Sequence, residues 1–205
     1  MQILKPLFAF FCAQLAIASP ITTEEDHSVG LVERADPITI SDAVKEWNKQ
    51  TGVPGNSLSE GLYVFRAKYP RNEVKDQNLG DLVKEARNFL NANHYMLISV
   101  EIKKKETGPP KKRKQTLDVG NVNFWDIGVD DNNKVTMPKP AAAYDFARAE
   151  KDGVEHDYLK KLGSKVKKFS DITPIAKAYV EAHQTYDPKT NNCLTFVDEV
   201  AKLLS

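Results

Sequence analysis

The chain has 205 residues, of which 41% are hydrophobic and 28% are charged. This composition is typical of an ordinary globular protein and excludes a low-complexity chain. The 29 basic and 28 acidic residues leave a formal net charge of +1, which is not the signature of a protein that binds nucleic acid through bulk charge.

The N-terminal residues predict an exported protein. Residues 1–18 contain Lys5, then the apolar run PLFAFFCAQLAIA, which is short for a membrane span and ends in a small-x-small pattern. These features are typical of a secretory signal peptide cleaved after Ala18. We therefore expect a secreted, extracellular protein with no transmembrane segment after cleavage. A retained membrane anchor is the alternative, and the polar residues that follow do not favour it.

Residues 19–36, SPITTEEDHSVGLVERAD, are acidic and show neither helical nor strand periodicity. The pair Glu33-Arg34 resembles a processing site, which would make this stretch a pro-segment. A disordered N-terminal extension agrees equally well with the sequence. The remaining residues 37–205 contain no internal repeat, so we expect a single α+β domain with a small antiparallel sheet packed against several helices.

The first third of this domain is predicted to be mainly helical. Residues 39–50 indicate a helix capped near Ser41, and residues 78–93 indicate an amphipathic helix. Residues 56–70 fit either a helix or a buried strand, and we favour the helix.

The middle of the domain is predicted to be a local antiparallel sheet. Residues 94–102, HYMLISVEI, form the best strand in the sequence, and residues 117–129 indicate a second strand. Between them, residues 103–116 contain many charges and two prolines, so we expect a long basic hairpin loop. Residues 130–133, DDNN, predict a turn, and residues 134–137 a third strand.

After this sheet the sequence predicts helical segments. Residues 141–151, 155–169 and 173–184 each have a helical pattern. In the last of these, Thr173 is the expected N-cap and Pro174 the expected first helical residue.

The cysteines give the most informative count. The sequence has two, and Cys12 would leave with the signal peptide, so Cys193 would be alone in the mature protein. Secreted domains usually pair their cysteines in disulfides. A solitary thiol therefore indicates burial, pairing between chains or a chemical use.

Cys193 opens the last predicted helix. An apolar stripe repeats there with helical spacing, and its members are Cys193, Phe196, Val197, Val200, Ala201 and Leu204. Residues 190–192 supply cap residues just before it. In the first turn of a helix, backbone N–H groups and the macrodipole favour a negative charge, so Cys193 is a candidate nucleophile. The alternative is that its side chain only packs in the core.

A thiol nucleophile needs a base, and three histidines follow the N-terminal segment. His183 falls on the apolar face of its helix, so we expect it in the core or at its rim. His156 lies among charged residues and is expected to be solvated. His94 opens the best strand, and a ring at that position can project at the end of the sheet. His94 is therefore the candidate base, with a structural role as its alternative.

Three segments together resemble the circularly permuted papain-like cysteine hydrolases, a group that includes NlpC/P60 amidases, lecithin:retinol acyltransferase-like enzymes and PPPDE peptidases. They are HYMLIS at 94–99, NFWDIGV at 123–129 and the C-terminal stretch at 173–204. In this group a histidine opens a strand, a later strand carries a polar partner, and a C-terminal helix begins Asn-Cys-x-x-Phe. The string NNCLTF at 191–196 matches that last element. The resemblance covers about residues 90–205 and implies a papain-like permuted core.

The resemblance also implies a mechanism. Cys193 would be the nucleophile, His94 the general base, and Asp126 the residue that orients the imidazole. A register slip would replace Asp126 by Asn123, and a Cys-His pair without a third residue is a further possibility. Asn192 would cap the helix or donate to an oxyanion. The expected activity is hydrolysis or acyl transfer on a peptide, amide or lipid-ester substrate, without a cofactor.

The basic loop is a candidate anion-binding site, with Lys111, Lys112, Arg113 and Lys114 as its central residues. Its partner would be an anionic polymer or surface; the alternative is a solvated hairpin tip. No aromatic residues alternate with these cations, so we do not expect sequence-specific nucleic-acid binding. We also find no metal-ligand spacing. The alternative function is a secreted, non-enzymatic effector or interaction protein with an inert Cys193.

Overall fold

The computed structural model describes residues 38–71, 80–110, 112–137, 144–163, 166 and 168–204. These residues all belong to one compact unit, Asp36–Ser205. The expected signal peptide, and the pro-segment or extension after it, lie outside the described residues. No helix in the described ranges has both the length and the apolar character needed to cross a lipid bilayer.

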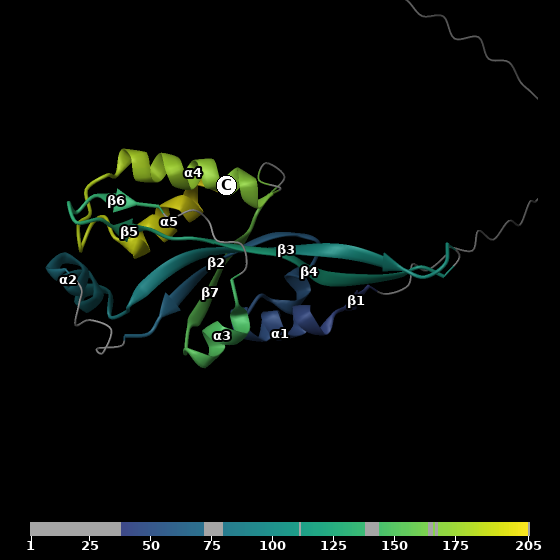
Figure 1. The fold of residues 1–205 in the computed structure, drawn as a ribbon. Coiled ribbons are helices and arrows are strands. Elements are labelled where there is room, and N and C mark those ends of the chain that lie inside the picture. Colours follow the sequence, from purple (N-terminus) through teal and green to yellow (C-terminus); the bar gives the residue numbers. More distant parts are fainter. Residues whose placement is uncertain are drawn as a thin grey trace, which may run out of the picture. The chain divides into compact units, whose positions relative to one another are not determined.

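A five-stranded sheet forms the centre of the domain (Figure 1). Its strands, in spatial order, are β1 (Thr39–Ile40), β4 (Lys114–Trp125), β3 (His94–Thr107), β2 (Gly61–Tyr69) and β7 (Glu155–Lys161). β1 pairs with β4 in parallel, and the other neighbours are antiparallel. The short strands β5 (Gly128–Val129) and β6 (Val135–Thr136) form a separate hairpin. The α+β class is confirmed.

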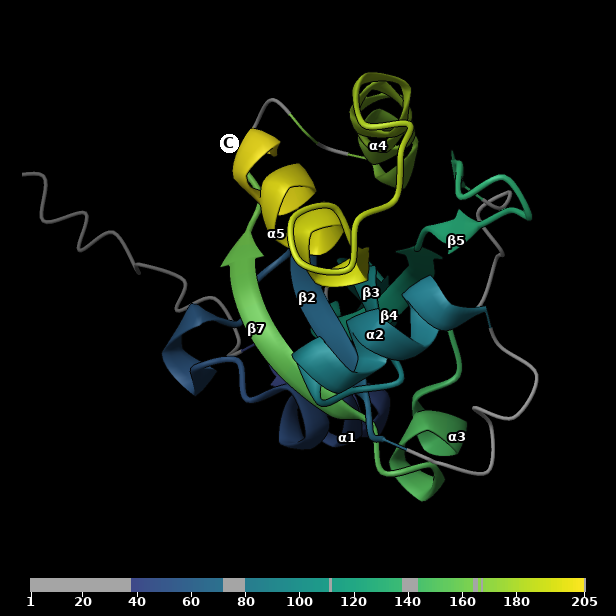
Figure 2. The same ribbon diagram turned by 90° about the vertical axis from the view of Figure 1, so that its left-hand side faces the viewer.

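Helices cover both faces of this sheet (Figure 2). On one face lie α4 (Phe169–Ala182) and α5 (Cys193–Leu203), and on the other α1 (Asp42–Thr51) and α3 (Phe146–Lys151). The helix α2 (Asp81–Leu90) lies at the end of the sheet where β3 begins. A short 3₁₀ helix, Gly55–Ser57, follows α1. The sheet therefore separates two apolar cores.

The C-terminal helix begins at the residue that the sequence predicts. Asn192 is the N-cap of α5, and the whole predicted stripe is buried: Cys193, Phe196, Val197, Val200, Ala201 and Leu204. This face of α5 packs on β3, and α5 also contacts α4. The amphipathic pattern therefore identified both the helix and its buried side.

Residues 61–69 form the strand β2, so the helix that we favoured over 56–70 is wrong. β2 lies between β3 and β7 and is buried on both sides. Leu62 and Val64 face the core under α4 and α5, whereas Tyr63 and Phe65 face the core over α1. A strand with two buried faces shows no polar alternation, which makes it hard to distinguish from a buried helix.

The helix predicted over 155–169 is also wrong, because residues 155–161 form the edge strand β7 and the next helix, α4, begins only at Phe169. The acidic side chains of β7 pair with cations of β2. Lys68 contacts Glu155 at 3.0 Å and Arg66 contacts Asp157 at 2.8 Å. Edge strands often carry charged residues, and here pairing with β2 overrides the local helical preference.

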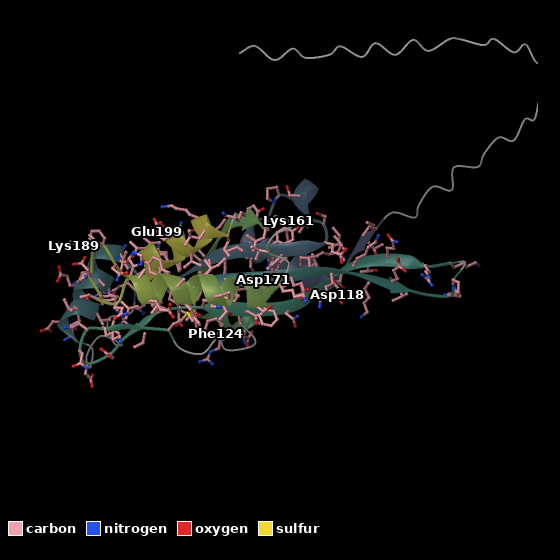
Figure 3. The ribbon with its side chains drawn as sticks, turned by 90° about the horizontal axis from the view of Figure 1, so that it is seen from above. Asp118, Phe124, Lys161, Asp171, Lys189 and Glu199 are labelled. Carbon is pink, nitrogen blue, oxygen red and sulfur yellow. The ribbon has the colours of Figure 1, made fainter. Side chains whose placement is uncertain are left out.

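The predicted basic loop is shorter than expected, because most of residues 103–116 belong to β3 and β4. The two strands continue as a ribbon until Thr107 pairs with Lys114. Asp118 lies near the base of this ribbon, where Lys105 approaches it to 3.8 Å (Figure 3). Opposite charges across the strands stabilise pairing in a segment whose charge density suggests a loop.

The turn predicted at residues 130–133 and the helix start predicted at Thr173 had different outcomes. The turn predicted at 130–133 is confirmed: the Asp130 carboxylate accepts hydrogen bonds from the backbone N–H groups of Asn132 (2.9 Å) and Lys134 (2.8 Å). The start predicted for the helix at Thr173 is wrong, because α4 begins at Phe169 and Pro174 lies inside it. The Thr173 hydroxyl instead accepts a hydrogen bond from the indole of Trp125, at 3.1 Å.

Candidate functional site

A cavity of about 270 Å³ lies where α2, the start of β3, the segment after β4 and the start of α5 meet. Its described lining residues are Val83, Ala86, Arg87, Leu90, Asn93, His94, Ile127, Gly128, Val129, Tyr186 and Cys193. A larger hollow, of about 410 Å³, lies beside the start of β2, and none of the described residues that line it is a cysteine or a histidine. We therefore take the smaller cavity as the candidate site, because it contains nucleophilic and basic groups together.

Cys193 enters this cavity from the first turn of α5. The side-chain oxygen of Asn192 accepts hydrogen bonds from the backbone N–H groups of Leu194 (2.9 Å) and Thr195 (3.1 Å), and the Thr195 hydroxyl accepts one from the N–H of Asn192 (2.7 Å). This reciprocal cap holds the start of the helix rigidly. Cys193 is 6% exposed, so its sulfur is accessible mainly through the cavity that it lines.

Two roles were expected for Asn192, helix capping and donation to an oxyanion, and its side chain performs the first. Its side-chain N–H group donates to the backbone carbonyl of Pro188 at 2.9 Å. The oxygen of the same amide is used by the cap, so both ends of the side chain are bound within the protein. Asn192 therefore ties the loop before α5 to the helix that carries Cys193.

His94 reaches the cavity because of how α2 ends. Asn91 ends the helix in the left-handed conformation, with φ 47°, and the N–H of Asn93 donates to the carbonyl of Tyr69 at 3.0 Å. The chain then enters β3, where His94 pairs with Tyr69 at the end of the sheet. The imidazole is 26% exposed, so it is accessible but largely surrounded by protein.

Asp126 is the carboxylate that contacts His94. The distance between Nε2 of His94 and Oδ2 of Asp126 is 3.2 Å. Asp126 follows the last residue of β4 and is 20% exposed in its side chain. Asn123, the other residue considered for this role, instead lies opposite Ser99 inside the sheet. The structure therefore brings Cys193, His94 and Asp126 together and leaves Asn123 away from the cavity.

The electrostatic surroundings favour a charged His94. Burial of the ring acts against its charged form, but the hydrogen bonds that the ring donates to Asp126 and Cys193, and the negative charges of both partners, outweigh burial and raise the pKa of His94 to about 9. The imidazole is therefore protonated at neutral pH. A protonated imidazole next to a thiol stabilises the thiolate form, which is the reactive form of a cysteine.

The other two histidines do not line the cavity. His156 is half-buried, not solvated as predicted, because its Nε2 atom lies 2.8 Å from the hydroxyl of Tyr144 and its ring packs on Phe146. Burial lowers the pKa of His156. His183 ends α4 and stacks on Tyr179, with 4.2 Å between the ring centres. Its exposed position at the end of α4 agrees with a residue at the rim of the core.

Sequence reasoning missed the wall that α2 contributes. Val83, Ala86, Arg87 and Leu90 all line the cavity, and their spacing along the sequence places them on one helical face. The amphipathic pattern identified that face but not what it covers. Tyr186, in the loop before α5, was also missed as a lining residue.

Tyr186 lies within electrostatic reach of the thiol. Burial and the negative charge of Cys193 raise the pKa of Tyr186, and the positive charge of Arg87 acts in the opposite direction. The phenol therefore keeps its proton at neutral pH and is a hydrogen-bond donor in the cavity. Its backbone N–H donates to the carbonyl of Asn133 at 2.9 Å, which links the loop to the β5–β6 hairpin.

The candidate anion-binding residues lie at the opposite end of β3 from His94. Lys112, Arg113 and Lys114 are exposed at the end of the β3–β4 ribbon, and Arg113 contacts Glu106 at 3.1 Å. Lys111 lies outside the described residues. Within the described part of the chain, no group of three or more His, Cys, Asp or Glu side chains is placed to hold a metal ion.

Comparison of the chain with protein-family models gave no match, and neither did comparison with curated proteins. No solved structure matched the fold. The resemblance to the permuted papain-like hydrolases therefore stays a prediction, based on the order of the three sequence segments.

Proposed function

We propose that the protein is a secreted thiol-dependent hydrolase or acyltransferase that acts on an amide, ester or thioester. The observation that supports this proposal is that Cys193 and His94 line one cavity and that Asp126 contacts the imidazole of His94. They come from the start of a helix, the start of a strand and the end of the neighbouring strand. A cysteine, a base and a group that orients the base form the arrangement that nucleophilic catalysis requires.

The first half of the reaction forms an acyl-enzyme. The Cys193 thiolate attacks the carbonyl carbon of the substrate, and the N-terminus of α5 stabilises the negative charge on sulfur before the attack. The charged His94 then gives its proton to the leaving amine or alcohol as the C–N or C–O bond breaks. This step leaves a thioester on Cys193 and a neutral imidazole on His94.

The second half transfers the acyl group. The neutral His94 removes a proton from water or from an acceptor alcohol or amine, whose oxygen or nitrogen attacks the thioester carbonyl. The C–S bond breaks, and the thiolate and the charged imidazole are restored. Asp126 binds Nε2 of His94, which leaves Nδ1 as the nitrogen available to Cys193. The Tyr186 hydroxyl is the donor that we assign to the carbonyl oxygen.

A second candidate function is a secreted, non-enzymatic effector or interaction protein. The low exposure of Cys193, 6%, favours an inert thiol in this case. The exposed cations at the end of the β3–β4 ribbon, Lys112, Arg113 and Lys114, would then contact an anionic polymer or surface. Reactivity of Cys193 separates this candidate from the enzyme.

The decisive experiment measures alkylation of Cys193 by iodoacetamide at about pH 6, with mass spectrometry of the peptide that contains it. An ordinary thiol, with a pKa of about 8.5, reacts slowly at this pH because little thiolate is present. We expect fast reaction in the wild type and a loss of roughly tenfold or more in His94→Ala. His183→Ala is the matched control, because His183 does not line the cavity. Equally slow reaction in the wild type and in His94→Ala would reject the enzyme.

A further inference from the structure

The loop between α4 and α5, residues 183–192, carries a group that the proposed reaction uses (Figure 2). Tyr186 lies in this loop, and Cys193 follows the loop directly. Both residues line the cavity, and both are buried, with exposed fractions of 7% and 6%. The conformation of the loop therefore decides where the phenol lies relative to the sulfur.

Asn191 binds this loop on both sides of Tyr186. Its side-chain N–H group donates to the carbonyl of Thr185 at 2.6 Å. Its backbone N–H donates to the carbonyl of Asp187, and its own carbonyl accepts from the N–H of Asp187, both at 3.0 Å. The residue before Tyr186 and the residue after it are thus both held by Asn191.

The buried amide of Asn191 uses its donors and its acceptor within the protein. Its nitrogen also donates to the carbonyl of His183 at 3.0 Å, and its oxygen accepts from the hydroxyl of Tyr179 at 3.0 Å. The reverse orientation of the amide would point its oxygen at the carbonyl oxygens of His183 and Thr185, so the contacts define the orientation. A carboxylate of the same shape would meet the same two carbonyls without a proton to donate.

The β5–β6 hairpin holds the loop as well. The backbone N–H of Tyr186 donates to the carbonyl of Asn133 at 2.9 Å, and the carbonyl of Gln184 accepts from the N–H of Val135 at 2.7 Å. Together with the bonds to Asn191, these contacts fix the backbone of residues 184–187. Burial then restricts the remaining rotation of the Tyr186 side chain.

Building on the proposed function, we infer that Asn191 is a positioning residue that holds Tyr186 beside Cys193, so that the phenol donates to the carbonyl oxygen of the substrate. A donor to a developing oxyanion is effective because it is already in place when the charge appears. Asn191 is not among the described residues that line the cavity, so it acts through Tyr186 and not on the substrate. This role also explains the first asparagine of NNCLTF, which the proposed reaction does not use.

The test compares two small probes of Cys193. With p-nitrophenyl acetate a C–S bond forms, the C–O bond breaks and p-nitrophenolate leaves with the bonding electrons, and negative charge develops on the carbonyl oxygen on the way. Iodoacetamide transfers a methylene to sulfur with loss of iodide, and its carbonyl oxygen gains no such charge. A donor to the carbonyl oxygen therefore accelerates acetylation and not alkylation. The initial burst of p-nitrophenolate absorbance measures acetylation, and peptide mass spectrometry measures alkylation.

We expect Tyr186→Phe and Asn191→Asp each to lower the acetylation rate roughly tenfold or more, with alkylation within about twofold of the wild type. The double variant should be no slower than Tyr186→Phe alone, because the two residues act as one unit. Asn123→Ala is the matched control: Asn123 is also a buried asparagine but is not among the described lining residues, so its replacement should leave the ratio of the two rates unchanged.

Three results would overturn the inference. They are an equal fall of both rates in Asn191→Asp, which indicates a merely structural role, a double variant whose loss is the product of the two single losses, and a change of the rate ratio in Asn123→Ala. If Asn191→Asp does not fold, Tyr179→Phe keeps the amide and removes only the hydroxyl that donates to it. Its acetylation rate should then fall about threefold, the scale of one hydrogen bond, and an unchanged rate would count against the inference.

The inference and the proposed function fail in different ways. A slow iodoacetamide reaction that His94→Ala does not change rejects the proposed function. A fast iodoacetamide reaction with a rate ratio that Tyr186→Phe does not change rejects the role of the phenol, and the role of Asn191 with it. A ratio that changes in Tyr186→Phe but not in Asn191→Asp rejects only the positioning role of Asn191.

Discussion

The imidazole of His94 and the carboxylate of Asp126 approach to 3.2 Å, although the two residues are 32 positions apart in the chain. The antiparallel pairing of β3 and β4 explains this contact. Leu97 lies opposite Trp125, so the residue that opens β3 and the residue that follows β4 lie at the same end of the hairpin. The distance is thus a consequence of strand register, and it gives the imidazole a charged partner.

Replacing Asp126 should change the titration of His94. In the wild type, hydrogen bonds and negative charges raise the pKa of His94 to about 9. Asp126→Asn removes one of the two anionic partners, so we expect the pKa to move down toward the ordinary value of about 6.5. Nuclear magnetic resonance of the labelled imidazole measures this directly. Asp131→Asn is the control, and an Asp126→Asn titration identical to the wild type would contradict the assigned contact.

The same shift predicts how stability depends on pH. The pKa of His94 is raised in the folded state, so the folded protein binds this proton more tightly than the unfolded chain. The contribution of His94 to the free energy of unfolding is therefore complete below about pH 6.5, and it is lost as the pH rises toward about 9. We expect the free energy of unfolding, measured with urea, to fall over this range by on the order of 1 kcal/mol more in the wild type than in His94→Gln. Parallel curves for the two proteins would refute this linkage.

The cap on α5 should contribute to both stability and reactivity. Asn192→Ala removes the hydrogen bonds to Leu194 and Thr195, so we expect a loss of about 1 kcal/mol in unfolding free energy. Alkylation of Cys193 should also slow, because the first turn that positions the sulfur loses its anchor. Asn192→Ser keeps a hydroxyl acceptor and should restore most of the stability. The capping role would be rejected if Asn192→Ser and Asn192→Ala were equally destabilised.

The ribbon and the cavity should behave independently. A triple variant in which Lys112, Arg113 and Lys114 are each replaced by glutamine should bind anionic lipid vesicles more weakly than the wild type at low salt. Alkylation of Cys193 should not change, because these cations lie at the far end of β3. Vesicle sedimentation and peptide mass spectrometry measure the two properties on the same samples. A change in Cys193 reactivity would show that the ribbon is coupled to the site.

The tip of the ribbon provides a further test of the hairpin itself. Gly108 has a φ of 101°, and a Cβ atom there would lie 2.6 Å from the backbone oxygen of Lys112. Gly108→Ala should therefore distort the turn and destabilise the protein by about 1 kcal/mol, because the turn requires a residue without a side chain. Thermal unfolding of this variant against Gly55→Ala, where the Cβ would meet open space, gives the comparison. Equal stability of the two variants would mean that the turn adapts.

Local patterns determined a definite part of this molecule. The helical spacing from Cys193 to Leu204 and the cap at Asn192 act over one to three turns of chain, so they could be predicted without tertiary contacts. The same holds for the strand that begins at His94 and for the turn that begins at Asp130.

Tertiary pairing decided the rest. The stretches that became β2 and β7 suit a helix locally, and they are strands because β2 lies between two neighbours and buries both faces. The choice of Asp126 over Asn123 depends on the register of β4 against β3, which local sequence does not specify. The helical pattern of α2 shows that one face is apolar, but only packing at the end of the sheet brings Arg87 to the cavity of Cys193. Interactions between neighbours in the chain are encoded where they occur, whereas contacts between distant segments exist only once the whole chain has folded.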